Sequence, residues 1–497
     1  MRRVALLLVA AGAVALASPS LAAATTRFAA PGGTAPDTIC TTRDMPCSIG
    51  AAAGGPDVTR NDEAIILPGN YTQSDLNGDT DQPNDHVVHP TAGVVRGEDP
   101  TERPVITLGT ETSVGAFVIG AGTVLSDIEI DTDADTRDIT ILGGTVNGLI
   151  ARSSRNFATV CATPVTTSAL IRNTACLSSG EGANALGVNT SVPAGKHTIT
   201  LRNVTAVATG VSSFGMTILA FGPPSSVDLT ADGDAVIARG DEADIRAGGL
   251  SLTPTVPNSG AKATVSLGHS NFATTMPLTD AGGGTTTISA PGSATNQTDP
   301  PRLAPDGYHE LAGSPTLEGG AVDAASGVKD IDGQNRTIGQ LPDIGADEIG
   351  FPTSTAIRCT PNPTQFGSGP VLCAVTVTDT SSPQPVSFHS GIRLHSERIG
   401  AFGGNCEVLG MSAPTQGSCT QPFSPGGPGV DRITATFPGD AIHDSSSGSD
   451  LLNVMALPSG QSGPGPQAPP RRAKCKKKKH HRAGAAKKRK CKKKKRR

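Results

Sequence analysis

The feature that most constrains the fold is a strand-and-turn template that recurs between about residue 60 and residue 290. Short apolar alternations in this region are broken by Gly, Asn and Asp, without the period of a helix. In four segments an apolar residue is followed two positions later by Asp, Asn or His, and five positions later by a second apolar residue. The first apolar residues of these segments are Leu125, Ile171, Leu201 and Leu267.

The spacing of these segments predicts a stack of coils. The four positions are 46, 30 and 66 residues apart. The first and last spacings divide into units of about 22 to 23 residues, the length of one coil of parallel strands, and 30 residues suit one coil with a loop. Asp127, Asn173 and Asn203 are expected at the bends, because Asn and Asp tolerate the left-handed backbone of a sharp turn. We therefore expect scaffold residues rather than catalytic residues at these positions.

The composition agrees with thin stacked coils rather than with a wide globular core. The chain of 497 residues has no Trp, two Tyr and only 3% aromatic residues. A narrow interior of Ala, Val, Ile and Leu needs no large rings. Of the 41 Lys and Arg residues, 18 lie in 471–497 without any Asp or Glu, so 23 basic residues stand against 44 acidic residues elsewhere. The sequence predicts an acidic body with a cationic tail.

The N-terminus and the cysteines predict export. Residues 1–23 have the charged start, the apolar run of about 14 residues and the small-residue end of a secretory signal peptide. This run is shorter than the roughly 20 residues of a membrane span, and we expect no transmembrane segment in the mature chain. Disulfides are favoured over zinc, because no CxxC or Cys/His cluster has ligand spacing. The expected pairs are Cys40–Cys47, Cys161–Cys176, Cys359–Cys373, Cys406–Cys419 and Cys475–Cys491.

Three segments resemble the pectin-lyase-like family of right-handed parallel β-helix proteins. NDEAIILPGNYTQ, with Pro68, Gly69 and Tyr71, resembles their first coil, and CTTRDMPCSIGAAAGG resembles their Cys-bounded entry with its short capping helix. Residues 313–350 carry SP, DIDG, R and PDIGADE in order, and resemble the closing segment of exported bacterial β-helix surface proteins. The resemblance implies a β-helix over residues 24–350, with the closing segment as a lid on the open edge of the last coil. Its expected turn residues are Asp330, Asp332, Gly333, Pro342, Asp343 and Gly345.

The C-terminal part predicts three further units. Residues 351–455 resemble the bacterial Ig-like repeat, and their alternating strands with frequent turn signals predict a small β-sandwich. Residues 456–470 are rich in Pro, Gly, Ser and Gln, which predicts a flexible linker. Residues 471–497 have no means of forming a core and predict a disordered basic tail. The expected fold class is therefore all-β, with a right-handed parallel β-helix followed by an Ig-like β-sandwich.

One acidic segment is a candidate metal site. Asp131, Asp133 and Asp135 alternate, so an extended strand would place their carboxylates on one side, where they could hold Ca²⁺. The alternative is a solvated acidic loop between coils. No other cofactor is expected. No catalytic residue is assigned, because the sequence shows no lyase, paired-carboxylate or nucleophile motif.

The cationic tail is the clearest functional feature. Each Lys or Arg near an anionic surface adds about 1 kcal/mol at most, so the tail is expected to bind anionic cell-wall polymers or membrane headgroups. Glycans are further candidate partners, nucleic acid would bind only non-specifically, and the tail could instead fold back on the acidic body. The tail lysines expected to bind are Lys476, Lys477, Lys478, Lys479, Lys492, Lys493, Lys494 and Lys495.

These observations predict a secreted, extracellular or cell-wall-associated protein with a structural or adhesive role. The alternative is a polysaccharide lyase or glycoside hydrolase acting in the β-helix groove, since enzymes of the resembling family act on polysaccharides along that groove. The fold alone does not establish such an activity.

Overall fold

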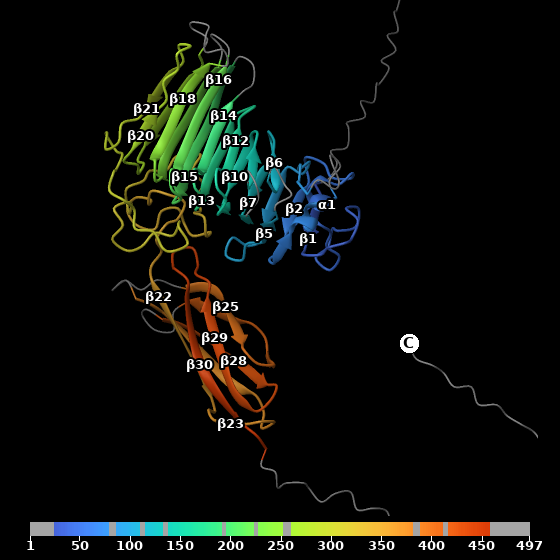
Figure 1. The fold of residues 1–497 in the computed structure, drawn as a ribbon. Coiled ribbons are helices and arrows are strands. Elements are labelled where there is room, and N and C mark those ends of the chain that lie inside the picture. Colours follow the sequence, from blue (N-terminus) through green and yellow to red (C-terminus); the bar gives the residue numbers. More distant parts are fainter. Residues whose placement is uncertain are drawn as a thin grey trace, which may run out of the picture.

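The computed structural model describes residues 24–78, 86–109, 115–132, 138–190, 195–222, 227–251, 260–380, 388–410 and 416–457. These residues are mostly β-strand and fall into a part with parallel sheets, up to residue 350, and a part with mainly antiparallel sheets (Figure 1). The all-β class expected from the sequence is confirmed. The expected signal peptide, most of the linker and the tail, with the eight lysines expected to bind, lie outside the described residues.

The first part is a stack of coils joined through parallel strand pairing, compatible with a β-helix-like fold. In the described chain, α1 (Ile49–Gly54) and the 3-10 helix η1 (Gln73–Leu76) are the helices. Fourteen strands form one sheet: β1 (Thr26–Ala29), β2 (Glu63–Ile66), β3 (Asn70–Thr72), β4 (Val94–Gly97), β5 (Val105–Leu108), β7 (Val124–Ser126), β8 (Glu129–Thr132), β10 (Gly144–Asn147), β11 (Ile150–Ser153), β13 (Ala169–Ser178), β15 (Gly195–Ala208), β17 (Val227–Arg239), β19 (Lys262–Gly268) and β21 (Thr285–Ile288). Seven strands form a second sheet: β6 (Phe117–Ile119), β9 (Ile139–Ile141), β12 (Thr159–Pro164), β14 (Asn184–Thr190), β16 (Phe214–Gly222), β18 (Ala243–Ser251) and β20 (Thr275–Pro277).

Left-handed residues stack at the bends of the larger sheet. The three expected bend residues, Asp127, Asn173 and Asn203, have φ angles of 59°, 47° and 54°. The strand register places Gly148, with a φ of 65°, between the first two, and Ala235, with a φ of 54°, after the third. The predicted bends at these Asp and Asn residues are confirmed, because each occupies the left-handed backbone conformation that Asn and Asp tolerate.

The coil count differs from the prediction in one interval. The 46-residue spacing contains one additional coil, whose bend is Gly148, as units of about 23 residues require. The 66-residue spacing contains one additional bend, at Ala235, although units of about 22 residues would divide it into three coils. The reason is that the coils widen in this interval, where β15 and β17 have 14 and 13 residues.

The interior of the stack is filled by small aliphatic side chains. Fully buried Ile171 and Leu201 of the larger sheet belong to the same core cluster as Ile218 of the smaller sheet. A disulfide between Cys161 of β12 and Cys176 of β13 joins the two sheets through this interior. The narrow core explains how the chain folds with so few aromatic residues.

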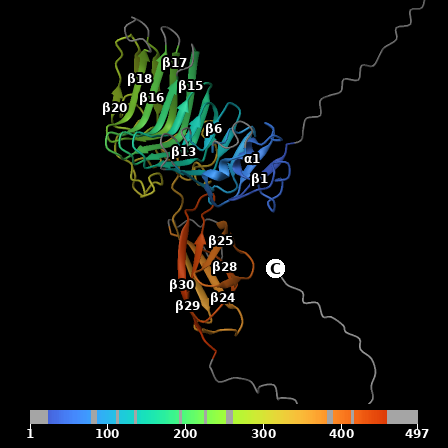
Figure 2. The same ribbon diagram turned by 45° about the vertical axis from the view of Figure 1, so that its right-hand side comes forward.

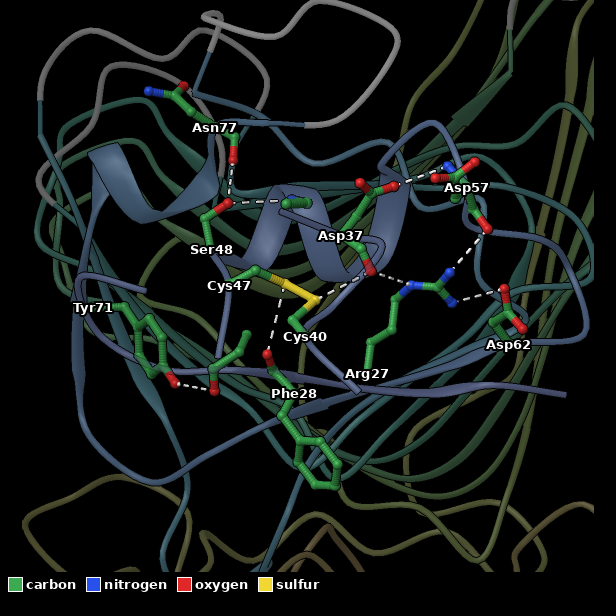
Figure 3. The surroundings of a disulfide bond; sticks show 12 residues. Arg27, Phe28, Asp37, Cys40, Cys47, Ser48, Asp57, Asp62, Tyr71 and Asn77 are labelled. Atoms are coloured by element: carbon green, nitrogen blue, oxygen red, sulfur yellow. Dashed lines mark hydrogen bonds and ion pairs between the residues drawn. A yellow bond between two sulfur atoms is a disulfide. The ribbon is translucent and has the colours of Figure 1, made fainter. Parts of the chain in front are cut away.

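The N-terminal end combines a helix, a disulfide and a buried ion pair (Figure 3). Ser48 follows the Cys40–Cys47 disulfide and caps α1, which packs against β1 and β2. Next to it, Arg27 and Asp62 form a 2.9 Å ion pair in which both side chains are about nine-tenths or more buried. The Tyr71 hydroxyl donates to backbone carbonyl oxygens at 2.8 and 3.0 Å, which holds the expected Pro-Gly-aromatic turn.

Four of the five expected disulfides are present. They are Cys40–Cys47, Cys161–Cys176, Cys359–Cys373 and Cys406–Cys419. The fifth pair, Cys475–Cys491, lies outside the described residues. These bonds indicate an oxidising, non-cytoplasmic environment.

The closing segment does not lie where the sequence predicted it. Instead of covering the open edge of the last coil, residues 313–350 run along the flank of the stack. The preceding residues 302–312 follow the same flank, and we include them in the closing segment below. The Asn173 side chain at the bend of β13 donates to the carbonyl of Ser326 at 3.3 Å. Arg103, which precedes β5 near the beginning of the stack, forms a 3.2 Å ion pair with Asp332. The prediction of a lid at the end of the stack is therefore wrong.

The physical reason is a set of apolar side chains outside the main core. Ile150 of β11 and Leu177 of β13 pack in a separate buried cluster with Tyr308, Ile331 and Ala346 of the closing segment. Without the closing segment these side chains of the coils would face water. Burial of one large aliphatic side chain stabilises a protein by about 1.5–3 kcal/mol, which favours the flank over the edge.

The second part is a sandwich of two sheets. Its first sheet contains, in order, β22 (Thr353–Thr360), β24 (Val371–Asp379), β28 (Gln416–Pro425) and β26 (Gly400–Phe402). Its second sheet contains β23 (Thr364–Gln365), β30 (Ser446–Met455), β29 (Gly429–Phe437), β25 (Phe388–Ser396) and β27 (Cys406–Gly410). Cys359–Cys373 joins neighbouring strands, whereas Cys406–Cys419 connects the two sheets. Figure 2 shows the sandwich beside the closing segment of the coil stack.

Candidate functional site

A cavity of about 920 Å³ lies where three parts of the chain meet. Its walls come from the segment 100–103 before β5, from the closing segment and from the connection between β29 and β30 of the sandwich. Ligand sites occur preferentially between domains, so this cavity is the candidate functional site. The polar side chains that line it include Arg103, His309, Asp332, Asp347, Arg393 and Asp444.

His309 lies between two carboxylates on the cavity wall. Its Nδ1 is 2.5 Å from Oδ2 of Asp306, and its Nε2 is 2.6 Å from Oδ2 of Asp332. Burial favours the neutral imidazole, but the hydrogen bonds to these two carboxylates outweigh burial and raise the pKa of His309 to about 11. Although burial also opposes ionisation of Asp306, its contact with His309 lowers the pKa of Asp306 to about 2. The wall therefore contains a charged imidazolium between acidic groups.

Asp347 brings a third carboxylate to this imidazole. It is 4% exposed, and its Oδ2 accepts the Glu310 backbone N–H at 2.7 Å. Burial raises the pKa of Asp347 well above its usual value, and the nearby Asp332 adds to this shift. One ligand atom each from His309, Asp332 and Asp347 lies within 4.8 Å of the others. An imidazole with two carboxylates is a donor set suited to a divalent metal ion.

A buried arginine positions the segment that carries Asp332 and Asp347. The Arg336 side chain is 2% exposed, and its guanidinium donates to the carbonyl groups of Gly345, at 3.0 Å, and of Ala346. Burial raises the pKa values of Glu310 and Glu348 to about 8, and the charge of Arg336 opposes both shifts. Arg336 thus connects the part of the closing segment that carries Glu310 with the part that carries Glu348.

The expected turn residues are confirmed in part. Oδ1 of Asp330 accepts two backbone N–H groups, and the carboxylate of Asp343 accepts those of residues 318 and 349. Gly333 and Gly345 have φ angles of 83° and 118°, where a Cβ would be strained. These residues shape the turns as predicted.

The sequence predicted Asp332 as a turn residue, and the structure corrects this prediction. Its carboxylate instead reaches His309 and Arg103 and lines the cavity. His309 and Asp347 were not predicted as site residues at all. The signal that could have found them is the density of acidic residues in the closing segment, which also contains Arg336.

One of the predicted calcium residues, Asp131, is not among the residues that line this cavity. Asp131 is exposed on β8, in register with Arg152 of β11. Asp133 and Asp135 lie outside the described residues. Asp138 is fully buried, and its two carboxylate oxygens have no hydrogen-bond partner in the part of the chain that is described. Calcium binding at Asp131, Asp133 and Asp135 stays a prediction.

Replacing Asp138 by Asn is expected to stabilise the protein at neutral pH. Burial raises the pKa of Asp138 well above its usual value of 3.8, and Asp131 adds to the shift. Because the folded-state pKa exceeds the unfolded one, the wild type loses stability as the pH rises above about 4, whereas Asn does not titrate. We therefore expect D138N to have a larger free energy of unfolding than the wild type at pH 7.

Urea unfolding at pH 7 and pH 4 measures this effect. The advantage of D138N should shrink towards pH 4, where a large part of the unfolded wild type also carries a protonated carboxyl group. The same stability difference at both pH values would contradict the proposed cause.

No family model, curated protein or solved structure matches this chain. Across the described ranges no helix is both long enough and apolar enough to cross a membrane.

Proposed function

We propose that this chain is a secreted, cell-surface-associated protein with a structural or adhesive role. Residues 24–350 form a right-handed parallel β-helix of the pectin-lyase-like class, and residues 351–455 form an Ig-like spacer. The tail at 471–497 holds the protein non-covalently on anionic envelope polymers. The stacked parallel coils and their left-handed bends support the first unit, and the two-sheet sandwich supports the second. The disulfides support export.

The observation that carries this proposal is the position of the closing segment. A β-helix that degrades polysaccharide needs an accessible groove along the outer face of its parallel strands. In this chain, residues 302–350 cover the face of β11 and β13 and bury Ile150 and Leu177 there. A flank covered by the chain itself suits a scaffold better than it suits a catalytic groove.

The sandwich reinforces this covering. The backbone N–H of Asn335 in the closing segment donates to the carbonyl of Ala441 in the sandwich at 2.6 Å. Arg393 of β25 forms a 2.6 Å ion pair with Glu102 of the coil stack. Contacts of the sandwich with both elements favour a joined scaffold over independent catalytic and binding modules.

Deletion of residues 471–497 is expected to release the protein from isolated envelopes at low salt. The segment holds 18 Lys and Arg residues, and each contributes up to about 1 kcal/mol of attraction at an anionic surface. We expect the retained fraction to fall at least about ten-fold in a sedimentation assay, which requires only about 1.4 kcal/mol of lost attraction. The retention of the wild type should decrease steeply as salt is raised.

A matched pair of full-length variants separates charge from other properties of the tail. Replacing the eight lysines 476–479 and 492–495 by Gln should weaken retention, whereas replacing them by Arg should preserve it. Retention of the deletion variant at the wild-type level would contradict the anchoring role.

The alternative enzymatic function has a direct assay. The purified protein would be incubated with a panel of polysaccharides, with and without Ca²⁺, and examined for new reducing ends and unsaturated uronate. We expect neither product above the level of a heat-denatured control. Sustained turnover of any glycan would overturn the structural role in favour of a lyase or hydrolase.

A further inference from the structure

We propose that His309, Asp332 and Asp347 bind a divalent transition-metal ion, with Zn²⁺ as the favoured ion, in the wall of the 920 Å³ cavity. The three residues supply one nitrogen and two oxygen ligand atoms within 4.8 Å of one another. Zinc commonly binds three protein ligands of these kinds and leaves a fourth position open. The imidazole favours zinc over Ca²⁺, which prefers sites made entirely of oxygen ligands.

The orientation of the imidazole fits a metal ligand. Nδ1 of His309 is hydrogen-bonded to Asp306 at 2.5 Å, which leaves Nε2 directed at Asp332. Histidines that bind metals usually donate their other ring N–H to a carboxylate, because this contact fixes the ring and makes the ligating nitrogen more basic. The ion would take the place of the proton that lies between Nε2 and Asp332 in its absence.

A second, independent observation is the state of Asp347. Its side chain is 4% exposed and lines the cavity, and Oδ2 accepts the Glu310 N–H. Oδ1 of Asp347 accepts no hydrogen bond from any residue that the structure describes. A carboxylate on a side chain as deeply buried as Asp347 is stabilised by a proton or a cation next to it, and its position on the cavity wall leaves it open to an ion.

The surroundings of Asp332 fit the same conclusion. Its Oδ1 accepts a hydrogen bond from Nη1 of Arg103 at 3.2 Å, which orients the carboxylate. Nη2 of Arg103 is buried and has no partner among the described residues, although the side chain lines the cavity. Because His309, Asp332 and Asp347 all line the cavity, the site is accessible from it and is not closed like a purely structural zinc site.

Metal binding would be measured by isothermal titration of the full-length protein with Zn²⁺ after treatment with a chelator. Other candidate ligands in the tail would be replaced by Ala or Ser in every sample; they are Cys475, His480, His481 and Cys491. We expect one strong site per chain, lost in D347N and in H309Q. D306N changes the carboxylate that is hydrogen-bonded to Nδ1 of His309 and does not change a ligand itself. This variant should weaken zinc binding by about 10- to 100-fold.

The matched control is H269N, which removes another imidazole hydrogen-bonded to an aspartate. Nδ1 of His269 lies 3.0 Å from Oδ1 of Asp234, outside the cavity, and its left-handed backbone tolerates Asn. This variant should bind Zn²⁺ like the wild type. Circular dichroism would verify the fold of each variant, and if D347N does not fold, H309Q and D306N still decide the question.

Anomalous diffraction at the zinc edge would locate the ion. Density between His309, Asp332 and Asp347 is the expected result. Three outcomes would overturn the proposal: no zinc uptake by the wild type, uptake unchanged in H309Q and D306N, or selective uptake of Ca²⁺ in place of zinc. The proposal does not depend on the anchoring role of the tail, since envelope retention and zinc titration are separate measurements.

Discussion

Replacing Arg336 by Met is expected to lower the free energy of unfolding by about 3–5 kcal/mol, the usual effect of removing one partner from a buried charge network. The Arg336 side chain is 2% exposed, and it donates to the carbonyl groups of Gly345, Ala346 and Asp347. Met has a similar length but no donor, so these carbonyl groups would lose hydrogen bonds inside the protein.

The loss would also affect the acidic side chains around Arg336. Its positive charge opposes the burial-induced rise in the pKa values of Glu310, Asp330, Asp343 and Glu348. Without this charge, we expect the carboxyl groups to take up protons at higher pH. A destabilisation of R336M that grows between pH 5 and pH 8 would follow from this coupling.

Chemical unfolding of R336M and R432M tests this expectation. Arg432 forms an ion pair with Glu397 on the sandwich in which both side chains are about half exposed. Such exposed pairs contribute about 0–1 kcal/mol, so R432M is a matched control for the loss of an arginine. A destabilisation of R336M no larger than that of R432M would show that the buried network does not hold the closing segment.

Removing the Cys161–Cys176 disulfide in the double variant C161A/C176A is expected to cost about 3 kcal/mol of stability. The bond closes a loop of 15 residues, and its loss gives the unfolded chain more conformational freedom. Both cysteines are completely buried in the interior between β12 and β13. Loss of the sulfur atoms adds a small cavity term in the same direction.

Hydrogen exchange followed by mass spectrometry locates this effect. We expect faster exchange in β12 and β13 of C161A/C176A. The matched control is C359A/C373A, which removes a disulfide with a sequence separation of 14 from the sandwich. This control should leave exchange in β12 and β13 unchanged. Equal protection of these strands in wild type and C161A/C176A would contradict the stabilising role of the interior bond.

The coil architecture was predictable because its signals are local. Asn173 and Asn203 mark the bends, since their short amide side chains tolerate the left-handed conformation that the structure places there. The disulfides pair cysteines that are close in sequence, and four of the five predicted pairs are present among the described residues. The prediction was wrong where a coil widened, as at Ala235, because no preferred bend residue marks that position.

The candidate site was not predictable in the same way. Arg103 and Asp332 are 229 residues apart in sequence and meet only because the closing segment returns along the stack. Asp332 stands in a segment in which Asp330 and Asp343 make ordinary turns, so its residue type alone does not distinguish it. His309 becomes a candidate ligand only when Asp306 and Asp332 are seen on its two sides.

Local sequence was enough to predict the strands, most of the bends and the four observed disulfides, because backbone preferences and short loops depend on neighbouring residues. Only the tertiary structure decided the path of the closing segment, the cavity and the meeting of His309, Asp332 and Asp347. The physical reason is that the path depends on which outward-facing apolar side chains need covering. That requirement is a sum of contacts between distant residues, and it exists only after the coils have stacked.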